Sequence, residues 1–155
     1  MLGARTAPLM TMRLTAIPLI TACALGATAA AHAAPKPFTG TDYSGTYDCK
    51  GQDDHEGPYT GEVTLQRVPS QSSGPYGAYS FKLDVPGYGS YPGQAAGKGK
   101  VLAIHFALTD PSTHDYGTGI AEFKQNKAGK WTFHKYYYEP EFKGGNFGIE
   151  DCVQR

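Results

Sequence analysis

Apolar and polar residues alternate in short stretches from about residue 43 to the end of the chain. In residues 59–68, Val63 and Leu65 fall on one side, and polar residues fill the positions between and around them. In residues 79–85, every second residue is apolar, ending at Val85. A period of two is typical of a strand that buries one face. The pattern therefore predicts consecutive strands.

Turn residues separate these stretches at short intervals. The remaining strands are predicted over 43–51, 101–109, 116–124, 131–138 and 147–153. Residues 86–99 are so rich in Gly, Pro and Tyr that they predict a long loop, with at most a short edge strand at Ser90 and Tyr91. Seven or eight antiparallel strands joined by short turns indicate an all-β fold, either an up-and-down barrel or a sandwich.

The composition supports the same fold class. The chain has 11 Tyr, 7 Phe and 20 Gly, and every Tyr and Phe follows residue 33. Aromatic residues favour strands and glycines favour tight turns, whereas long runs of helix-forming residues are absent from this part of the sequence. The chain is therefore expected to contain little or no helix after its first 33 residues.

Residues 1–33 have the pattern of an export signal. Arg13 precedes an apolar stretch over 14–25, and Ala31-His32-Ala33 has small residues where a signal peptidase requires them. We expect cleavage before Ala34, a periplasmic or secreted protein, and a single domain over 34–155. Cys23 leaves an alternative open, because the residues before it resemble a lipoprotein processing site that would place a lipid anchor on Cys23.

Two cysteines, Cys49 and Cys152, follow the leader. Exported compartments are oxidising, so we expect these two residues to form a disulfide bond. Bridged Cα atoms lie within about 7 Å of each other, a distance that neighbouring strands satisfy. The first and last strands would then lie side by side, as the closure of a meander requires. We therefore expect a small antiparallel barrel of seven or eight strands, with its first and last strands linked.

The charge balance excludes two classes of partner. Lys and Arg number 14, Asp and Glu also number 14, and the leader removes only Arg5 and Arg13. Such a chain lacks the basic surface that nucleic acids require. It also lacks the basic cluster that attracts anionic membranes, and no transmembrane segment is predicted after the leader. The expected partner is a small ligand or another protein.

Catalytic and cofactor motifs are absent from the sequence. It contains no nucleophile elbow and no glycine-rich phosphate loop, so we expect a protein that is not an enzyme and holds no cofactor. His55, His114 and Asp115 lie in oxygen-rich turns and are weak candidates for metal ligands, although their spacing matches no established pattern. The alternative is that these turns are solvated. Glu139 and Glu141 are expected to be surface charges.

A run of three tyrosines offers the best candidate binding surface. In a strand, Tyr137 shares a face with Trp131 and Phe133, which makes that face the core side. The opposite side presents planar rings with hydroxyl groups, which suit a ligand, a sugar ring or a protein partner. The alternative is that the rings fill a narrow barrel. The residues of the predicted binding site are His134, Tyr136, Tyr138, Tyr88 and Tyr91.

One short motif resembles a known family. The run Tyr47-Asp48-Cys49-Lys50-Gly51, with a second cysteine near the C-terminus, resembles the eight-stranded barrels of the periplasmic inhibitors of C-type lysozyme and, more loosely, the calycin barrels. The resemblance implies a barrel of the same kind. In that family a Ser/Gly-rich stretch ending in Lys-Tyr enters the lysozyme cleft. The nearest match, residues 72–76, has Pro75 at the lysine position.

Two functions are consistent with these features. The first is an exported, non-catalytic binding module that recognises a small ligand, a glycan or a protein through the barrel mouth or an aromatic face. The alternative is an envelope interaction protein without a ligand cavity, such as a lysozyme inhibitor. A cavity would favour the first function, whereas a filled core with exposed aromatic residues would favour the second.

Overall fold

A computed structural model describes residues 36–155 of the chain. The expected leader, its cleavage before Ala34 and the alternative lipid anchor at Cys23 lie outside the described residues. Within the described part, no helix has the length and apolar character needed to cross a membrane.

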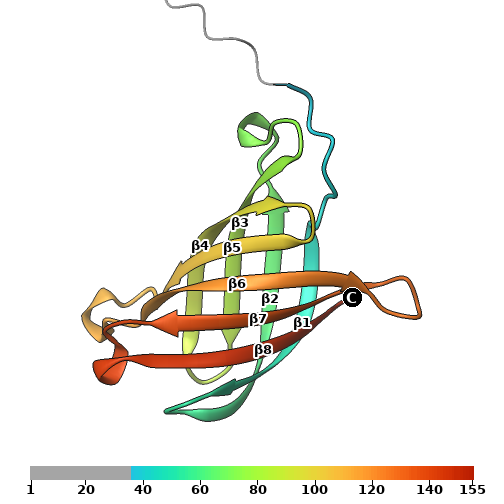
Figure 1. Cartoon of the computed structure of the whole chain (residues 1–155). Helices are drawn as coiled ribbons and strands as arrows, with labels where there is room; N and C mark the ends of the chain where they lie inside the picture. Colours follow the sequence, from blue (N-terminus) through green and yellow to red (C-terminus); the bar gives the residue numbers. More distant parts are fainter. Residues whose placement is uncertain (1–35) are drawn as a thin grey trace, which may run out of the picture. The chain divides into compact units, whose positions relative to one another are not determined.

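Eight antiparallel strands form a closed barrel, in which each strand pairs with the next and β8 pairs with β1 (Figure 1). The strands are β1 Gly45–Asp53, β2 Gly57–Arg67, β3 Tyr76–Val85, β4 Gly89–Lys98, β5 Val101–Ala107, β6 Tyr116–Gln125, β7 Trp131–Glu139 and β8 Asn146–Gln154. Single 3₁₀ turns lie in three of the connections, at Pro69–Gln71, Pro111–Thr113 and Phe142–Gly144. The predicted all-β fold and its closure into a barrel are confirmed.

The prediction of a long loop over residues 86–99 is wrong, because most of this segment is strand β4. This strand pairs with β3 along its whole length, from Val85↔Gly89 to Tyr76↔Lys98. Its glycines allow close approach to β5: a Cβ atom added at Gly93 would lie 1.9 Å from the carbonyl oxygen of His105. Residues that are typical of loops therefore form a strand here, because β4 approaches β5 too closely at Gly93 to leave room for a side chain.

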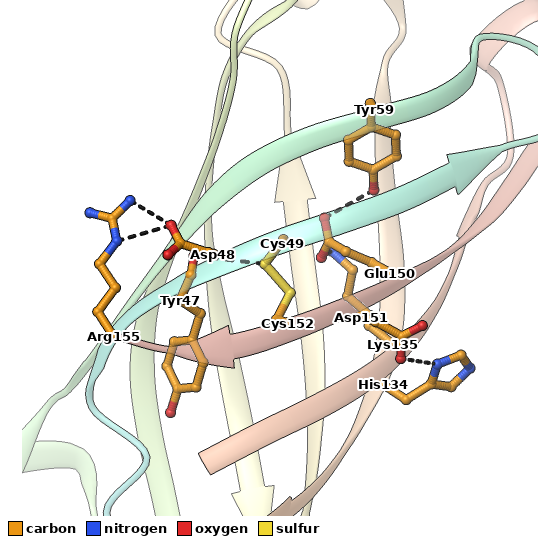
Figure 2. Close-up of a disulfide and its surroundings, with 10 residues drawn as sticks. All are labelled: Tyr47, Asp48, Cys49, Tyr59, His134, Lys135, Glu150, Asp151, Cys152 and Arg155. Atoms are coloured by element: carbon orange, nitrogen blue, oxygen red, sulfur yellow. Dashed lines mark hydrogen bonds and ion pairs between the residues drawn. A yellow bond between two sulfur atoms is a disulfide. The ribbon is translucent and has the colours of Figure 1, made fainter. Parts of the chain in front are cut away.

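The disulfide between the first and last strands is present. Cys49 in β1 lies directly opposite Cys152 in β8, with 4.1 Å between their Cα atoms (Figure 2). The bond joins residues separated by 103 positions. In the chain-entropy model, a loop of about 100 residues makes such a bond worth about 4.7 kcal/mol, which is a large share of a typical domain's stability of ~5–15 kcal/mol.

Aromatic rings fill one end of the barrel. Tyr43, just before β1, packs with its ring centre 4.2 Å from that of Phe123 and 5.0 Å from that of Trp131. Its hydroxyl group donates a hydrogen bond of 2.8 Å to the carbonyl oxygen of Gly99 in the β4–β5 turn. Phe133 packs 4.9 Å from Phe123 in the layer below. This end of the barrel is therefore closed by packed rings.

Loss of the disulfide should destabilise the barrel strongly. We expect Cys49→Ala to lower the free energy of unfolding by about 2–5 kcal/mol, because the unfolded chain regains its loop entropy. The melting temperature should fall by roughly 4–8 °C for each kcal/mol. Thermal melts of oxidised wild type and variant measure the effect. Thiol titration of the unfolded, unreduced protein is the control, and two free thiols per wild-type chain would contradict the assignment.

Candidate functional site

The interior at the other end of the barrel is acidic. Asp53 ends β1, Glu139 ends β7, and Asp115 immediately precedes β6. Odd-numbered strands end where even-numbered strands begin, so the antiparallel topology brings all three carboxyl groups to this end. Their exposed fractions are only 6%, 5% and 7%, respectively. Carboxyl side chains are rarely buried so completely without a charged partner.

Neutral donors from neighbouring strands hold these carboxyl groups. The hydroxyl group of Tyr137 donates to Oδ2 of Asp53 at 2.7 Å, and that of Tyr91 donates to Oδ2 of Asp115 at 2.9 Å. The amide nitrogen of Asn146 donates to Oδ2 of Asp53 at 2.8 Å and also to Oε2 of Glu139. One amide in β8 thus bridges the acids that end β1 and β7.

Asp53 also shapes the turn that follows β1. The backbone N–H groups of His55 and Glu56 both donate to its Oδ1 at 2.9 Å. Burial opposes ionisation of Asp53, but the hydrogen bonds from these N–H groups, from Asn146 and from Tyr137 favour the carboxylate and lower its pKa overall. Asp53 therefore remains negatively charged at neutral pH.

The pKa values of Glu139 and Asp115 shift in the opposite direction to that of Asp53. Burial raises the pKa of Glu139 to about 8, against the hydrogen bond from Asn146 and with added repulsion from Asp115 and Asp53. Burial also raises the pKa of Asp115; the hydrogen bond from Tyr91 and the nearby side chain of Glu139 oppose this shift, and the charge of Asp53 adds to it. The three acids therefore avoid carrying three negative charges, because Glu139 holds a proton at neutral pH.

A pocket of about 50 Å³ opens among these groups, and we call it the acidic pocket. Oδ1 of Asp115 is buried there and has no hydrogen-bond partner among the described residues. The rim includes Glu56, from the β1–β2 turn, whose carboxylate pairs with Lys143. The pocket is lined by four acidic residues, one lysine, six aromatic residues and two aliphatic residues: Asp53, Glu56, Asp115, Glu139, Lys135, Tyr59, Tyr88, Tyr91, Phe106, Tyr137, Phe142, Leu83 and Val85.

A fully buried ion pair lies beside the acidic pocket. Lys135 in β7 faces Glu150 in β8, with 2.7 Å between Nζ and Oε2. The hydroxyl group of Tyr59 donates to Oε1 of Glu150 at 3.0 Å, and Figure 2 shows this contact next to the disulfide. Nζ of Lys135 lies 5.3 to 5.4 Å from the ring centres of Phe81, Phe106 and Tyr137. The barrel interior thus holds one ammonium group between a carboxylate and three rings.

The predicted binding residues lie on two separate surfaces. Tyr88 and Tyr91 line the acidic pocket, whereas Tyr136 and Tyr138 are on the outside of the barrel, with exposed fractions of 50% and 46%. His134 is also outside, where its Nδ1 lies 2.9 Å from Oδ1 of Asp151 (Figure 2). The strand wall divides this set, because Tyr91 points inward from β4, whereas His134, Tyr136 and Tyr138 lie on the outward face of β7.

Tyr136 and Tyr138 belong to an apolar surface over β6, β7 and β8. In the strand register, Tyr136 lies between Ile120 and Ile149, and Tyr138 lies opposite Phe147. All five side chains are exposed. We call these five residues the outer patch. Single exposed apolar residues are common on soluble proteins, but a contiguous group across three strands is typical of a contact surface.

The structure does not bring the candidate metal ligands together. The His55 ring donates through Nε2 to the carbonyl oxygen of Gly145 at 3.1 Å, and Nδ1 of His114 lies 2.8 Å from Oε2 of Glu141 on the surface. Asp115, the next residue, points into the barrel. Within residues 36–155, the one close group of ligand-type atoms comprises Cys49, Glu150 and Cys152, and the disulfide occupies both sulfur atoms.

Sequence reasoning missed several interior polar groups. Glu139 was expected on the surface and is instead buried, as are Lys135, Asn146 and Glu150. A signal for Lys135 and Glu139 was present, because both share the alternating face of Phe133 with the core residues of β7. Charged residues on an apolar face indicate a buried polar site, and the period of two would have located them.

Comparisons with protein-family models, with curated proteins and with solved structures find no match for this chain. The resemblance to the lysozyme inhibitors therefore stays a prediction, and the function has to be inferred from the site itself.

The raised pKa of Glu139 should appear in the pH dependence of stability. Between its unfolded pKa of about 4.5 and its folded pKa of about 8, the folded protein binds more protons than the unfolded chain. The contribution of Glu139 to the free energy of unfolding is therefore fully present below pH 4.5 and is lost as the pH rises toward 8. We expect Glu139→Gln to match wild type near pH 5 and to melt at a higher temperature near pH 9.

Thermal melts of both proteins across this range provide the measurement. Glu122→Gln, at an exposed position of β6, is the matched control and should follow the wild-type curve. Parallel curves for wild type and Glu139→Gln would show that Glu139 does not titrate as the buried environment requires.

Proposed function

We propose that this protein is an exported, non-catalytic binding module whose ligand enters the acidic pocket. The observation that carries this proposal is Oδ1 of Asp115, a buried carboxyl oxygen of a pocket-lining residue that has no hydrogen-bond partner among residues 36–155. Buried acceptors are normally satisfied, and leaving one unpaired is costly. A ligand with a donor group would remove that cost. The pocket also joins polar groups to aromatic walls, as is typical of small-molecule sites.

The chemistry of the lining supports binding in preference to catalysis. The pocket is lined by carboxyl groups, aromatic and aliphatic side chains and one lysine. That lysine, Lys135, is held by Glu150 in an ion pair, and an ammonium group has no lone pair with which to attack a substrate. The carboxyl groups accept hydrogen bonds from rigid neighbours. This arrangement orients a bound group and supplies no activated nucleophile.

A retained ligand is the direct test of this proposal. We expect native mass spectrometry of protein purified from its exported fraction to show a bound small molecule. Tyr88→Ala should reduce the bound fraction, because this half-exposed ring lines the pocket and contributes little to the core. Tyr76→Ala, at an equally exposed tyrosine outside the pocket, is the matched control. Only the mass of the unliganded chain, in every preparation, would contradict the proposal.

The outer patch favours a second candidate function, an interaction protein that contacts a protein partner. Its five exposed apolar side chains lie on the opposite side of the wall from the acidic pocket, so a partner there needs no cavity. Aromatic residues such as Tyr136 and Tyr138 are enriched in protein interfaces. The sequence resemblance suggests one specific partner for this second function, a C-type lysozyme that the protein would inhibit.

The tyrosines of β7 allow this surface to be tested without damage to the fold. We expect Tyr136→Ala and Tyr138→Ala to change stability by less than about 1 kcal/mol, because both rings are half exposed. Tyr137→Ala, at the buried position between them, should cost about 3–5 kcal/mol. Thermal melts measure the three effects. Strong destabilisation by the outer substitutions would identify those rings as structural.

The same variants then report on the partner. If the outer patch contacts a C-type lysozyme, wild-type protein should inhibit the enzyme stoichiometrically and the two outer variants should inhibit it less. Full lysozyme activity at every ratio would remove this version of the second function.

A further inference from the structure

The acidic pocket holds no positive charge that is free to pair with its inner acids, within the described residues. Lys135, which lines the pocket, pairs with Glu150, and Lys143 pairs with Glu56. Of its four carboxyl groups, Glu56 is paired with Lys143, whereas Asp53, Asp115 and Glu139 form no ion pair within residues 36–155. Their partners are hydroxyl, amide and backbone N–H donors, which are all neutral. Buried charges are normally paired with an opposite charge. Asp53 is ionised and has no oppositely charged partner among the described residues, so a bound group with a positive charge would complete the pocket.

The unpaired oxygen specifies a cation that donates hydrogen bonds. Oδ1 of Asp115 is an acceptor, buried and without a partner among the described residues, and it belongs to a residue that lines the pocket. An ammonium group carries three donors and no acceptor, so it can satisfy this oxygen and a second carboxylate simultaneously. A quaternary ammonium group, without N–H donors, would leave the oxygen unsatisfied.

The walls favour an organic cation over a metal ion. Rings of Tyr88, Tyr91 and Phe142 line the pocket, and aromatic faces attract ammonium groups. A metal ion instead requires oxygen ligands that converge at about 2.0–2.6 Å. In the described part of the chain, the carboxyl oxygens of Asp53, Asp115 and Glu139 do not form a close three-ligand group. The pocket therefore has the groups for an ammonium ion without the convergence that a metal needs.

The barrel already binds an ammonium group of its own in the same way. Nζ of Lys135 is held by the carboxylate of Glu150, and it lies over the rings of Phe106 and Tyr137, which also line the acidic pocket. The pocket volume of about 50 Å³ exceeds the ~10–15 Å³ that one water molecule requires. It accommodates an amine head group with a short part of its alkyl chain.

We propose that the acidic pocket binds a primary alkylammonium group between Asp53 and Asp115, against the rings of Tyr88 and Phe142. This inference rests on the proposed function and names the chemical class of its ligand. The head group can belong to a free alkylamine or to a lysine side chain of a peptide, since both present the same terminal chemistry.

A proton and the ammonium group should compete for this site. Glu139 faces Asp115, Asp53 and the amide of Asn146, and its raised pKa means that a proton offsets part of the negative charge when the pocket is empty. A bound ammonium group would favour release of that proton. The affinity is therefore expected to increase between pH 6 and pH 9, where primary alkylamines remain mostly charged.

Isothermal titration of the exported protein with n-butylamine and with n-butanol tests the charge requirement. The two probes have nearly the same shape. We expect butylammonium to bind at least about tenfold more tightly than n-butanol, because hydrogen bonds between charged groups are stronger than those of a neutral hydroxyl group. Asp115→Asn should weaken butylammonium binding by a similar factor. Glu141→Gln, an exposed carboxyl group outside the pocket, is the matched control. Tyr88→Ala provides a second variant whose folding does not depend on a buried acid.

The outcomes separate this inference from the proposed function. Equal or tighter binding of n-butanol, or a retained ligand that is neutral or anionic, would overturn the ammonium assignment and leave a binding module. Absence of any bound small molecule, with no response to either probe, would overturn both. A lysine-containing peptide and a free diamine are titrated in parallel. The one that binds more tightly identifies the source of the amine.

Discussion

The hydrogen-bonded seam between β1 and β8 is the interaction on which the rest of the structure depends. A meander of eight strands has two free edges, and pairing the first strand with the last removes both. The disulfide between Cys49 and Cys152 covalently links β1 to β8 at one residue pair of this seam. Once the sheet is closed, every strand has one face inside and one outside. The alternation of residues along the chain then decides what lies in the core.

Closure also limits what the interior can hold. An eight-stranded barrel is just wide enough to be filled by its own side chains. Rings of Tyr43, Phe123 and Phe133 fill one end, and apolar residues together with the buried ion pair of Lys135 and Glu150 fill the interior beyond them. At the other end, the strands meet short polar turns, and Asp53 both shapes a turn and points inward. The remaining space is small, polar and negatively charged, so the ligand that we propose for it is limited to one small group.

The strand wall keeps the two candidate surfaces independent. Tyr137 points inward to Asp53, whereas its neighbours Tyr136 and Tyr138 point outward into the outer patch. A ligand in the acidic pocket and a partner on the outer patch would therefore contact different side chains of the same strand. The two proposed functions do not exclude each other, and the barrel permits both contacts at once.

Local pattern in the sequence determined the all-β class, most strand positions, the cysteine pair and the burial of Tyr137 between two outward tyrosines. These features depend on neighbours along the chain, where a period of two is directly visible. Strand β4 required the tertiary structure, because its glycine-rich residues are ordered by pairing with β3 and β5. The acidic pocket also required it. Asp53, Asp115 and Glu139 lie far apart in the sequence, and only closure of the barrel brings strand ends from across the chain to the same opening.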